Sequence, residues 1–249
     1  MNDICMTVVL YGASGSGKST VAKELQKLGF DRIRQITTRK PRIFPGDYPG
    51  IVVDERKLNE YDFMGEAAFL RLFDEGVLAE YNSFDKVEDG KLHTVWYGSY
   101  IWKFNEPGFH VITTNIEGAG QIASCEEITG DLLFVEMVKS RADILGNAAR
   151  RKRDSLEEIV RRSMSEFDLY YRPNRHDKFC GKGFKPDLMF DDSPLSGYLK
   201  LEGYEGDWIH EKGSGMVLYS SDCEDVAEDI LMAVVRKLEM KEENDGREV

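Results

Sequence analysis

The chain has 249 residues, of which 41% are hydrophobic and 31% charged, and its formal net charge is −12 at pH 7. This composition is typical of a globular chain with a substantial core, and the acidic balance argues against a protein that lives on DNA or RNA. No apolar run approaches the roughly 20 residues of a membrane span, and the first predicted strand begins too soon after Met1 for a signal peptide, so we expect a cytoplasmic protein without membrane contact.

The first predicted element is a strand that leads into a glycine-rich loop. Residues 8–20 read Val-Val-Leu-Tyr-Gly-Ala-Ser-Gly-Ser-Gly-Lys-Ser-Thr, an apolar run followed by the pattern G-x-x-x-x-G-K-[ST]. The glycines of this phosphate-binding P-loop let successive backbone N–H groups turn towards phosphate oxygens. Lys18 can reach the β- and γ-phosphates of a nucleoside triphosphate, and the hydroxyl of Ser19 is placed to ligate Mg²⁺. The residues expected to hold the nucleotide are Gly12, Ser14, Gly15, Ser16, Gly17, Lys18, Ser19 and Thr20.

Strands and helices alternate along the rest of the chain, which predicts an α/β fold with a doubly wound parallel sheet. Its strands are expected at 7–11, 32–37, 110–114, 131–137 and 188–190. Helices are expected at 21–28, 62–75, 150–162 and 222–242. Residues 77–81 and 94–100 are rich in β-forming side chains and predict a small antiparallel sheet apart from the main one.

A basic loop follows the first helix. Residues 36–42 read Ile-Thr-Thr-Arg-Lys-Pro-Arg, and residues 39–50 contain three of the seven prolines of the chain. We expect a specifically shaped loop here without regular structure. Arg39 and Arg42 are close together and Pro41 stiffens the turn between them, so two guanidinium groups can converge on one phosphate. The alternative is a solvated basic turn, but a basic loop beside a P-loop in an acidic chain favours a bound anion.

Together these motifs resemble those of the guanylate kinase family, and they occur in the same order over residues 5–192. The P-loop is similar to that family's version nearly residue for residue. The run from Thr37 to Arg42 resembles its T-T-R-x-P-R loop, which binds the acceptor phosphate. The resemblance implies ATP and Mg²⁺ as cofactors, with the γ-phosphate passing from ATP to GMP or dGMP.

Further motifs resemble the parts of the family that bind the acceptor nucleotide. Tyr48 follows Gly46 and Asp47 where the family keeps a phosphate-touching tyrosine. Glu80 lies in Gly-Val-Leu-Ala-Glu-Tyr, which looks like the family's G-x-x-x-E-[YW], whose glutamate reads the guanine edge. Tyr97 and Ser99 lie in a Y-G-[ST] element, which implies that Tyr97 contacts the acceptor phosphate and Ser99 contacts guanine O6.

The stretch from Arg151 to Arg162 is similar to the family's lid, which implies that both arginines close over the transferred phosphoryl group. The alternative for this stretch is a solvated charged helix. Such a lid would exclude water from the reaction. With Lys18, Arg39 and Arg42, these two arginines make up the expected catalytic set.

The chain departs from the family at several positions, among them Leu156 and Asp191, and three others concern the acceptor and the metal. Gln35 stands where the family usually has a serine, Asn115 replaces a base-reading acid, and Thr113 replaces the acid that organises the metal's water. Asn115 can both donate and accept hydrogen bonds, whereas an aspartate could only accept. We therefore expect broader or altered base specificity than in an ordinary guanylate kinase.

The resemblance implies a P-loop kinase domain at 1–195, with an acceptor-binding region at 36–100 and a helical lid at 146–165. Residues 196–249 are expected to form an extension, with an irregular segment and a C-terminal helix packed on the same domain. The implied partners are small nucleotide substrates. Two alternatives stay open: a kinase for another acceptor, either a modified deoxynucleotide or a nucleoside within DNA, and a non-catalytic binding module. The intact P-loop glycines and Lys18 argue against the second.

Overall fold

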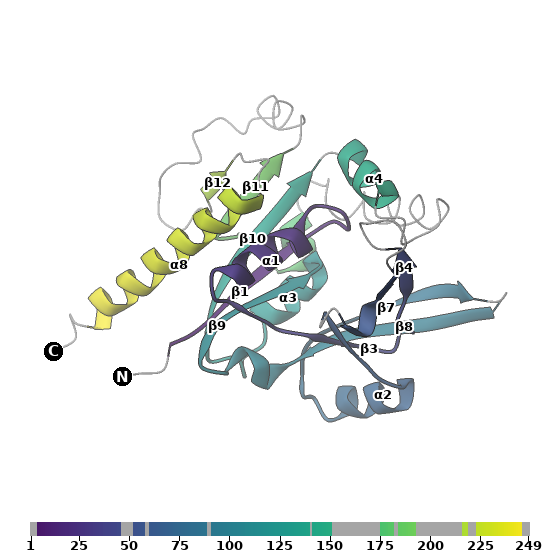
Figure 1. Ribbon diagram of the computed structural model, residues 1–249. Helices are drawn as coiled ribbons and strands as arrows, with labels where there is room; N and C mark the ends of the chain where they lie inside the picture. Colours follow the sequence, from purple (N-terminus) through teal and green to yellow (C-terminus); the bar gives the residue numbers. More distant parts are fainter. Residues whose placement is uncertain are drawn as a thin grey trace.

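The computed structural model describes residues 4–45, 52–57, 60–88, 91–139, 141–150, 175–181, 184–192, 216–218 and 223–245. These residues form a six-stranded sheet, a separate four-stranded sheet and a two-stranded hairpin (Figure 1). The predicted α/β fold with a parallel main sheet is confirmed. Within the described residues, no helix is both long and apolar enough to cross a membrane.

The main sheet is wholly parallel and has the order β12-β11-β10-β1-β9-β2. Its strands are β1 (Cys5–Gly12), β2 (Asp31–Arg32), β9 (Gly108–Thr114), β10 (Asp131–Lys139), β11 (Leu188–Asp192) and β12 (Met216–Leu218). In register, Tyr11 pairs with Thr114 of β9, and Gly12 pairs with Met137 of β10. The carboxyl ends of these three strands therefore meet at one edge, which is where open α/β sheets bind ligands.

Helices cover both faces of this sheet because the side chains of a buried strand alternate between them. On one face α1 (Lys18–Lys27) packs with α8 (Cys223–Asp245), and their core includes Val8, Leu10, Val21, Leu25, Val226, Ile230 and Val234. On the other face lie α3 (Ile116–Ala123) and α6 (Arg175–Phe179), with a core that includes Val9, Tyr11, Ile112, Ile116 and Ile122. Figure 1 shows α1 and α8 side by side across the main sheet. The buried central strand β1 thus gives the P-loop that follows it a rigid support.

The small sheet has the order β6-β3-β8-β7. Its strands are β3 (Gln35–Thr37), β6 (Tyr61–Phe63), β7 (Leu78–Glu88) and β8 (Lys91–Tyr100). The predicted antiparallel pairing of β7 with β8 is confirmed, and the sheet also contains β3, which pairs antiparallel with β8 and parallel with β6. Helix α2 (Glu66–Asp74) packs on this sheet through the buried Phe69, whose ring stacks on Trp96 at 5.8 Å between centroids.

Two predictions in the segment after α1 were wrong. The strand expected at 32–37 is two strands in different sheets, because the chain leaves the main sheet after Arg32 and enters the small sheet at Gln35. The buried Ile33 anchors this crossing, and its N–H donates to the carbonyl of Val111. The segment 39–50 is not wholly irregular, since β4 (Ile43–Pro45) pairs antiparallel with β5 (Val52–Asp54). Pro45 is tolerated there because each strand of a two-stranded ribbon is an edge.

Short elements complete the described chain: the 3₁₀ helices η1 (Glu55–Lys57) and η2 (Ile101–Phe104), and helix α4 (Arg141–Arg150). The predictions for Tyr48, Arg151 and Arg162, and most of the expected lid, lie outside the described residues.

Candidate functional site

The P-loop leaves the end of β1 through glycines that no other residue could easily replace. Gly12, Gly15 and Gly17 have φ of 147°, 93° and 101°, in the left-handed region that favours glycine. A Cβ on Gly12 would lie 2.3 Å from the carbonyl oxygen of Met137, so the loop passes tightly against β10. Gly17 is also the N-cap of α1, and no acidic residue occupies the first turn of that helix. The loop therefore has the shape and the electrostatics of an anion site.

Lys18 lies folded against this loop. Its Nζ donates to the carbonyl oxygens of Gly12 at 2.6 Å and Ala13 at 2.7 Å. The hydroxyl of Ser16 is fully buried and has no hydrogen-bond partner among the described residues. A buried polar atom of this kind is costly unless a ligand satisfies it. These residues fit a bound phosphate chain.

A metal accompanying the phosphates would depend on the hydroxyl of Ser19, at the start of α1. In the part of the chain that the structure describes, no three His, Cys, Asp or Glu side chains gather as a metal site. Mg²⁺ accepts such a setting because it is held by few protein oxygens together with substrate phosphates and water.

Helix α4 packs against the P-loop at Gly15. The amide Nδ2 of Asn147 donates to the carbonyl oxygen of Gly15 at 2.9 Å. A Cβ on Gly15 would lie 3.0 Å from the carbonyl oxygen of Ile144. Asn147 therefore helps to fix the orientation of the Gly15 peptide, whose N–H, on Ser16, donates to the carbonyl oxygen of Ala13 at 3.1 Å within the loop. The sequence analysis did not single out Asn147, because its role depends on the packing of α4.

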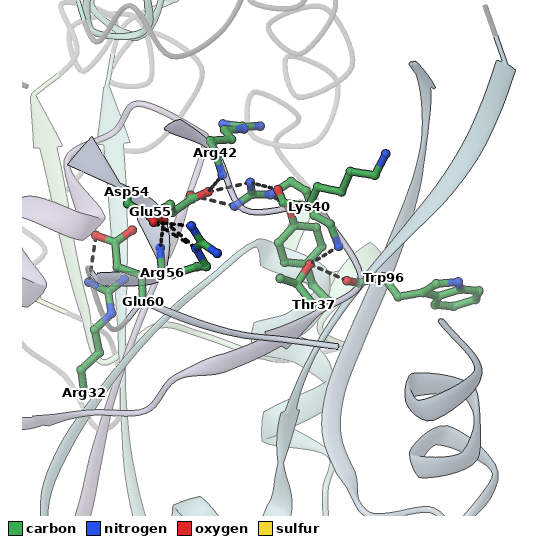
Figure 2. Close-up of polar contacts among 11 residues, drawn as sticks. Arg32, Thr37, Lys40, Arg42, Asp54, Glu55, Arg56, Glu60 and Trp96 are labelled. Carbon is green, nitrogen blue, oxygen red and sulfur yellow. Dashed lines mark hydrogen bonds and ion pairs between the residues drawn. The ribbon is translucent and has the colours of Figure 1, made fainter. Parts of the chain in front are cut away.

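The predicted acceptor-phosphate residues lie on the small sheet and the hairpin next to it. Arg39 is 5% exposed, and its two terminal nitrogens donate to the two carboxylate oxygens of Glu55, each at 2.7 Å. Its Nε donates to the hydroxyl of Tyr97 at 2.8 Å. The backbone N–H of Arg42 donates to Glu55 at 2.9 Å, and in Figure 2 the guanidinium group of Arg42 points away from that carboxylate. Arg39 thus holds an internal anion in the way that it would hold a phosphate.

The pKa values of this pair agree with a charged interaction. Burial would raise the pKa of Glu55, but the hydrogen bonds from Arg39 and from the backbone of Arg42 hold it below its ordinary value. Burial would lower the pKa of Arg39, but its hydrogen bond to Glu55 and the interaction with Tyr97 raise it. Both groups therefore stay ionised at neutral pH.

A second tyrosine, Tyr61, lies beside Arg39 in addition to the predicted Tyr97, and the sequence analysis did not select it. The ring of Tyr61 is 5.4 Å from the guanidinium carbon of Arg39 and 5.7 Å from the ring of Tyr97. Burial, followed by the proximity of Tyr97 and Glu60, raises the pKa of Tyr61 to about 12. A usable signal existed in the sequence: Tyr61 and Phe63 alternate directly before an amphipathic helix, which predicts two aromatic rings on one face of a strand.

The predicted base-reading residues also meet. Glu80 is 1% exposed, and its Oε1 accepts from the hydroxyl of Ser99 at 2.7 Å and from Nε2 of Gln35 at 2.9 Å. Its Oε2 accepts from the hydroxyl of Thr114 at 3.4 Å. Burial raises the pKa of Glu80, and the three hydrogen bonds only partly offset this effect. Thr114 is the last residue of β9 in the main sheet, whereas Gln35, Glu80 and Ser99 lie in the small sheet. The hydrogen bonds of Glu80 therefore connect the two sheets.

Asn115 has a local role that the sequence analysis did not select, although an asparagine directly before a helix is a common N-cap. It is the N-cap of α3, and its Oδ1 accepts from the backbone N–H of Gly118 at 2.7 Å. A Cβ on Gly118 would lie 2.1 Å from the hydroxyl oxygen of Thr114 and 2.8 Å from Oε2 of Glu80. The start of α3 is therefore seated directly on Glu80. With Oδ1 engaged as a cap, Asn115 would present its amide nitrogen, a donor, to a ligand.

Comparison with known proteins gives a distant relationship. No protein-family profile matches the chain. Over 165 residues, which are 64% of this chain and 73% of the relative, it is 27% identical to the guanylate kinase of Rickettsia prowazekii. Identity to the guanylate kinase of Rickettsia typhi is 26% over the same shares. The crystal structure of guanylate kinase from Anaplasma phagocytophilum aligns with a TM-score of 0.45 at 16% identity, covering 95% of this chain and 88% of that one. The chain is a distant homologue of the two Rickettsia guanylate kinases.

Proposed function

We propose that this protein is an ATP-dependent nucleoside monophosphate kinase that phosphorylates GMP or dGMP. The observation that carries the proposal is the link between two sites. The P-loop follows Tyr11, which pairs with Thr114, and Thr114 donates to the carboxylate of Glu80. The P-loop and the buried hydrogen-bonded cluster around Glu80 thus lie at the ends of two adjacent strands, which supports a transfer between a donor and an acceptor nucleotide.

Catalysis would consist of positioning and charge neutralisation, because an acceptor phosphate is already ionised at neutral pH. Lys18 would leave the carbonyls of its own loop and bind the β- and γ-phosphates, and the buried hydroxyl of Ser16 would gain a partner. Mg²⁺, held by the hydroxyl of Ser19 and by the phosphates, would supply further neutralisation of the developing charge. Arg151 and Arg162 would close over the transferred group and exclude water.

The acceptor phosphate would be bound chiefly by the side chain of Arg42 and the hydroxyl of Tyr97, with Tyr48 as a third predicted contact. Arg39 shares its two terminal nitrogens with Glu55, so its contribution is to orient Tyr97 and to supply positive charge. Glu80 and Ser99 would read the base, and Asn115 would approach the base from the main sheet.

Gln35 favours a second candidate, a kinase for a different purine acceptor. Its amide takes up one lone pair of Glu80 Oε1, and the hydroxyl of Ser99 takes up the other. Guanine presents two donors, N1–H and N2–H₂, to a carboxylate. A carboxylate with one oxygen already bonded to Gln35 and Ser99 can accept from these two donors less fully. Hypoxanthine presents N1–H alone.

The test is a coupled assay of ADP formation from ATP with each ribo- and deoxynucleoside monophosphate and with single-stranded DNA. We expect turnover with GMP or dGMP that Lys18→Ala abolishes. Lys27→Ala is the matched control, since Lys27 is exposed at the far end of the same helix. Lack of ATP consumption with every acceptor would contradict the kinase function, and turnover with DNA alone would replace the proposed substrate.

A further inference from the structure

A buried arginine, Arg32, connects the two sheets and is not part of the site described above. It is the last residue of β2 and pairs with Val111 of β9, so its backbone belongs to the main sheet. Its Nη2 donates to the hydroxyl oxygen of Thr113 at 3.3 Å. Its Nη1 lies 3.7 Å from Oε1 of Glu60, which directly precedes β6 of the small sheet (Figure 2). The guanidinium group therefore lies between the two sheets.

The contact with Thr113 places this guanidinium group on the face of the main sheet that carries the P-loop helix. Thr113 is the next-to-last residue of β9, at the carboxyl end of the strand. Side chains two residues apart on a strand share a face, so Thr113 lies on the same face as Val111. Val111 packs in one core with Val21 of α1, the helix that begins at Lys18. Arg32 thus reaches the donor-binding edge of the sheet on the side of α1.

The contact with Glu60 places the same group beside the predicted acceptor-phosphate residues. Glu60 is followed by Tyr61, whose ring lies 5.4 Å from the guanidinium carbon of Arg39. Burial raises the pKa of Tyr61, and the positive charges of Arg39 and Arg32 both oppose this rise, because both lie close to the tyrosine. Arg32 therefore stands between the end of β9 and the residues that surround Arg39.

The contacts of Arg32 are longer than those of its neighbour. Arg39 donates two hydrogen bonds of 2.7 Å to one carboxylate, and charge-assisted hydrogen bonds are ordinarily about 2.7–2.9 Å long. Arg32 makes one hydrogen bond of 3.3 Å to a hydroxyl group and one ion pair of 3.7 Å, although its side chain and that of Glu60 are each only 8% exposed. A phosphate group would match the planar fork of a guanidinium group better than these partners do.

We propose that Arg32 is a further phosphate-binding arginine, which contacts the phosphoryl group that lies between the donor and the acceptor nucleotide. This inference rests on the proposed function, because it requires that both nucleotides bind. A cation at this point neutralises the negative charge that two approaching phosphate groups bring together. Glu60 is the partner of Arg32 when no nucleotide is bound, and the phosphoryl group replaces it. Thr113 then keeps the guanidinium group at the carboxyl end of β9.

The experiment measures, by calorimetry, the binding of a dinucleotide in which a pentaphosphate chain joins adenosine to guanosine, so that one molecule spans both sites. ATP alone and GMP alone are measured with the same proteins. A charge-assisted hydrogen bond corresponds to about 10-fold or more in affinity. We expect Arg32→Met to weaken binding of the dinucleotide by about 10-fold or more, but binding of ATP or GMP alone by less than about 3-fold. Arg32→Lys should recover part of the loss, since it keeps the charge without the fork.

Glu60→Gln is the matched control for a purely structural ion pair. It removes the same pair but keeps Arg32, so we expect it to bind the dinucleotide at least as tightly as the parent. The double variant Arg32→Met/Glu60→Gln removes both charges of the pair, so neither is left buried without the other. It should bind the dinucleotide as weakly as Arg32→Met, and it preserves the test if Arg32→Met alone does not fold.

Three outcomes would overturn the proposal. Equal losses of dinucleotide affinity in Arg32→Met and Glu60→Gln would mean that the ion pair acts only on the structure. An equal loss for ATP alone and for the dinucleotide would assign Arg32 to the donor site alone. Tight binding of the dinucleotide by both the parent and Arg32→Met would remove this inference and leave the proposed function intact, whereas a parent that does not bind the dinucleotide would contradict both.

Discussion

The carboxylate of Glu55 lies across both terminal nitrogens of Arg39, at 2.7 Å from each, and both side chains are 4% exposed. The pair ties the hairpin of β4 and β5 to the end of β3, and the backbone of Arg42 adds a third hydrogen bond. Removing one partner of a buried ion pair leaves the other charge uncompensated, which costs far more than the pair contributes when intact.

We therefore expect Glu55→Ala to lower the free energy of unfolding by about 3–5 kcal/mol. Asp54→Ala is the matched control, because the neighbouring pair of Asp54 with Arg56 is exposed and screened by solvent, so its loss should change the free energy of unfolding far less. Urea denaturation of the three proteins measures both values. Equal losses in the two variants would mean that Arg39 finds another partner when Glu55 is absent.

The same pair gives the dependence of stability on pH a definite sign. The folded-state pKa of Glu55 lies below its ordinary value of 4.5. Its contribution to stability is thus fully present above pH 4.5 and is lost as the pH falls through the folded-state pKa. We expect the unfolding free energy of the parent to fall more steeply below that pH than that of Glu55→Gln. Glu80 acts with the opposite sign because burial raises its pKa, but it is common to both proteins and cancels in the difference.

Gln35 should weaken the discrimination between guanine and hypoxanthine. Replacing it by serine removes the amide donor from Glu80 Oε1, which then has a lone pair for the second N–H of guanine. We expect the ratio of kcat/KM for GMP over IMP to rise about 2- to 10-fold in Gln35→Ser, the range of one hydrogen bond. The KM for ATP should not change, since Gln35 lies on the small sheet. An unchanged ratio would show that Glu80 is not the base reader.

Asn147 should tune the P-loop without touching the acceptor site. Asn147→Ala removes the hydrogen bond to the carbonyl of Gly15, so the backbone of the P-loop is held less firmly in the shape that fits a phosphate chain. We expect ATP affinity to fall by about 2- to 10-fold while the KM of the acceptor is retained. Asn147→Asp should be worse, because a carboxylate would face the same carbonyl without a donor. If Asn147→Ala raised only the acceptor KM, α4 would belong to the other half of the site.

Local patterns in the sequence were sufficient for the P-loop, for most of the main strands and for the pairing of β7 with β8, and the resemblance to the guanylate kinases added the meeting of Glu80 with Ser99. Each of these depends on residues within one element or on adjacent strands of a hairpin, as β7 and β8 are. The partnership of Arg39 with Glu55 could not be predicted, because it depends on the short strands β4 and β5, in a segment where the sequence predicted no regular structure. The place of Tyr61 beside Arg39 depends on the parallel pairing of β6 with β3, and the alternation of Tyr61 with Phe63 indicates a strand without indicating its partner.

The split of the segment 31–37 between two sheets has the same origin. The residues from Arg32 to Gln35 are compatible with one continuous strand. Only the burial of Ile33 in the core of the main sheet marks the point where the chain passes from the main sheet to the small sheet. Hydrophobic periodicity reports that a residue is buried but does not report in which core.

The close packing of Gly118 against the carboxylate of Glu80 means that the protein must open before a ligand can reach this carboxylate. A ligand cannot touch a carboxylate that is 1% exposed, so the small sheet must separate from α3 before any base is read. The hydrogen bonds from Tyr81 to Gln121, from Asn82 to Glu117 and from Thr114 to Glu80 would break in that step. The acceptor would then replace contacts that the protein makes with itself. Its observed affinity would be its intrinsic affinity reduced by the fraction of molecules that stand open.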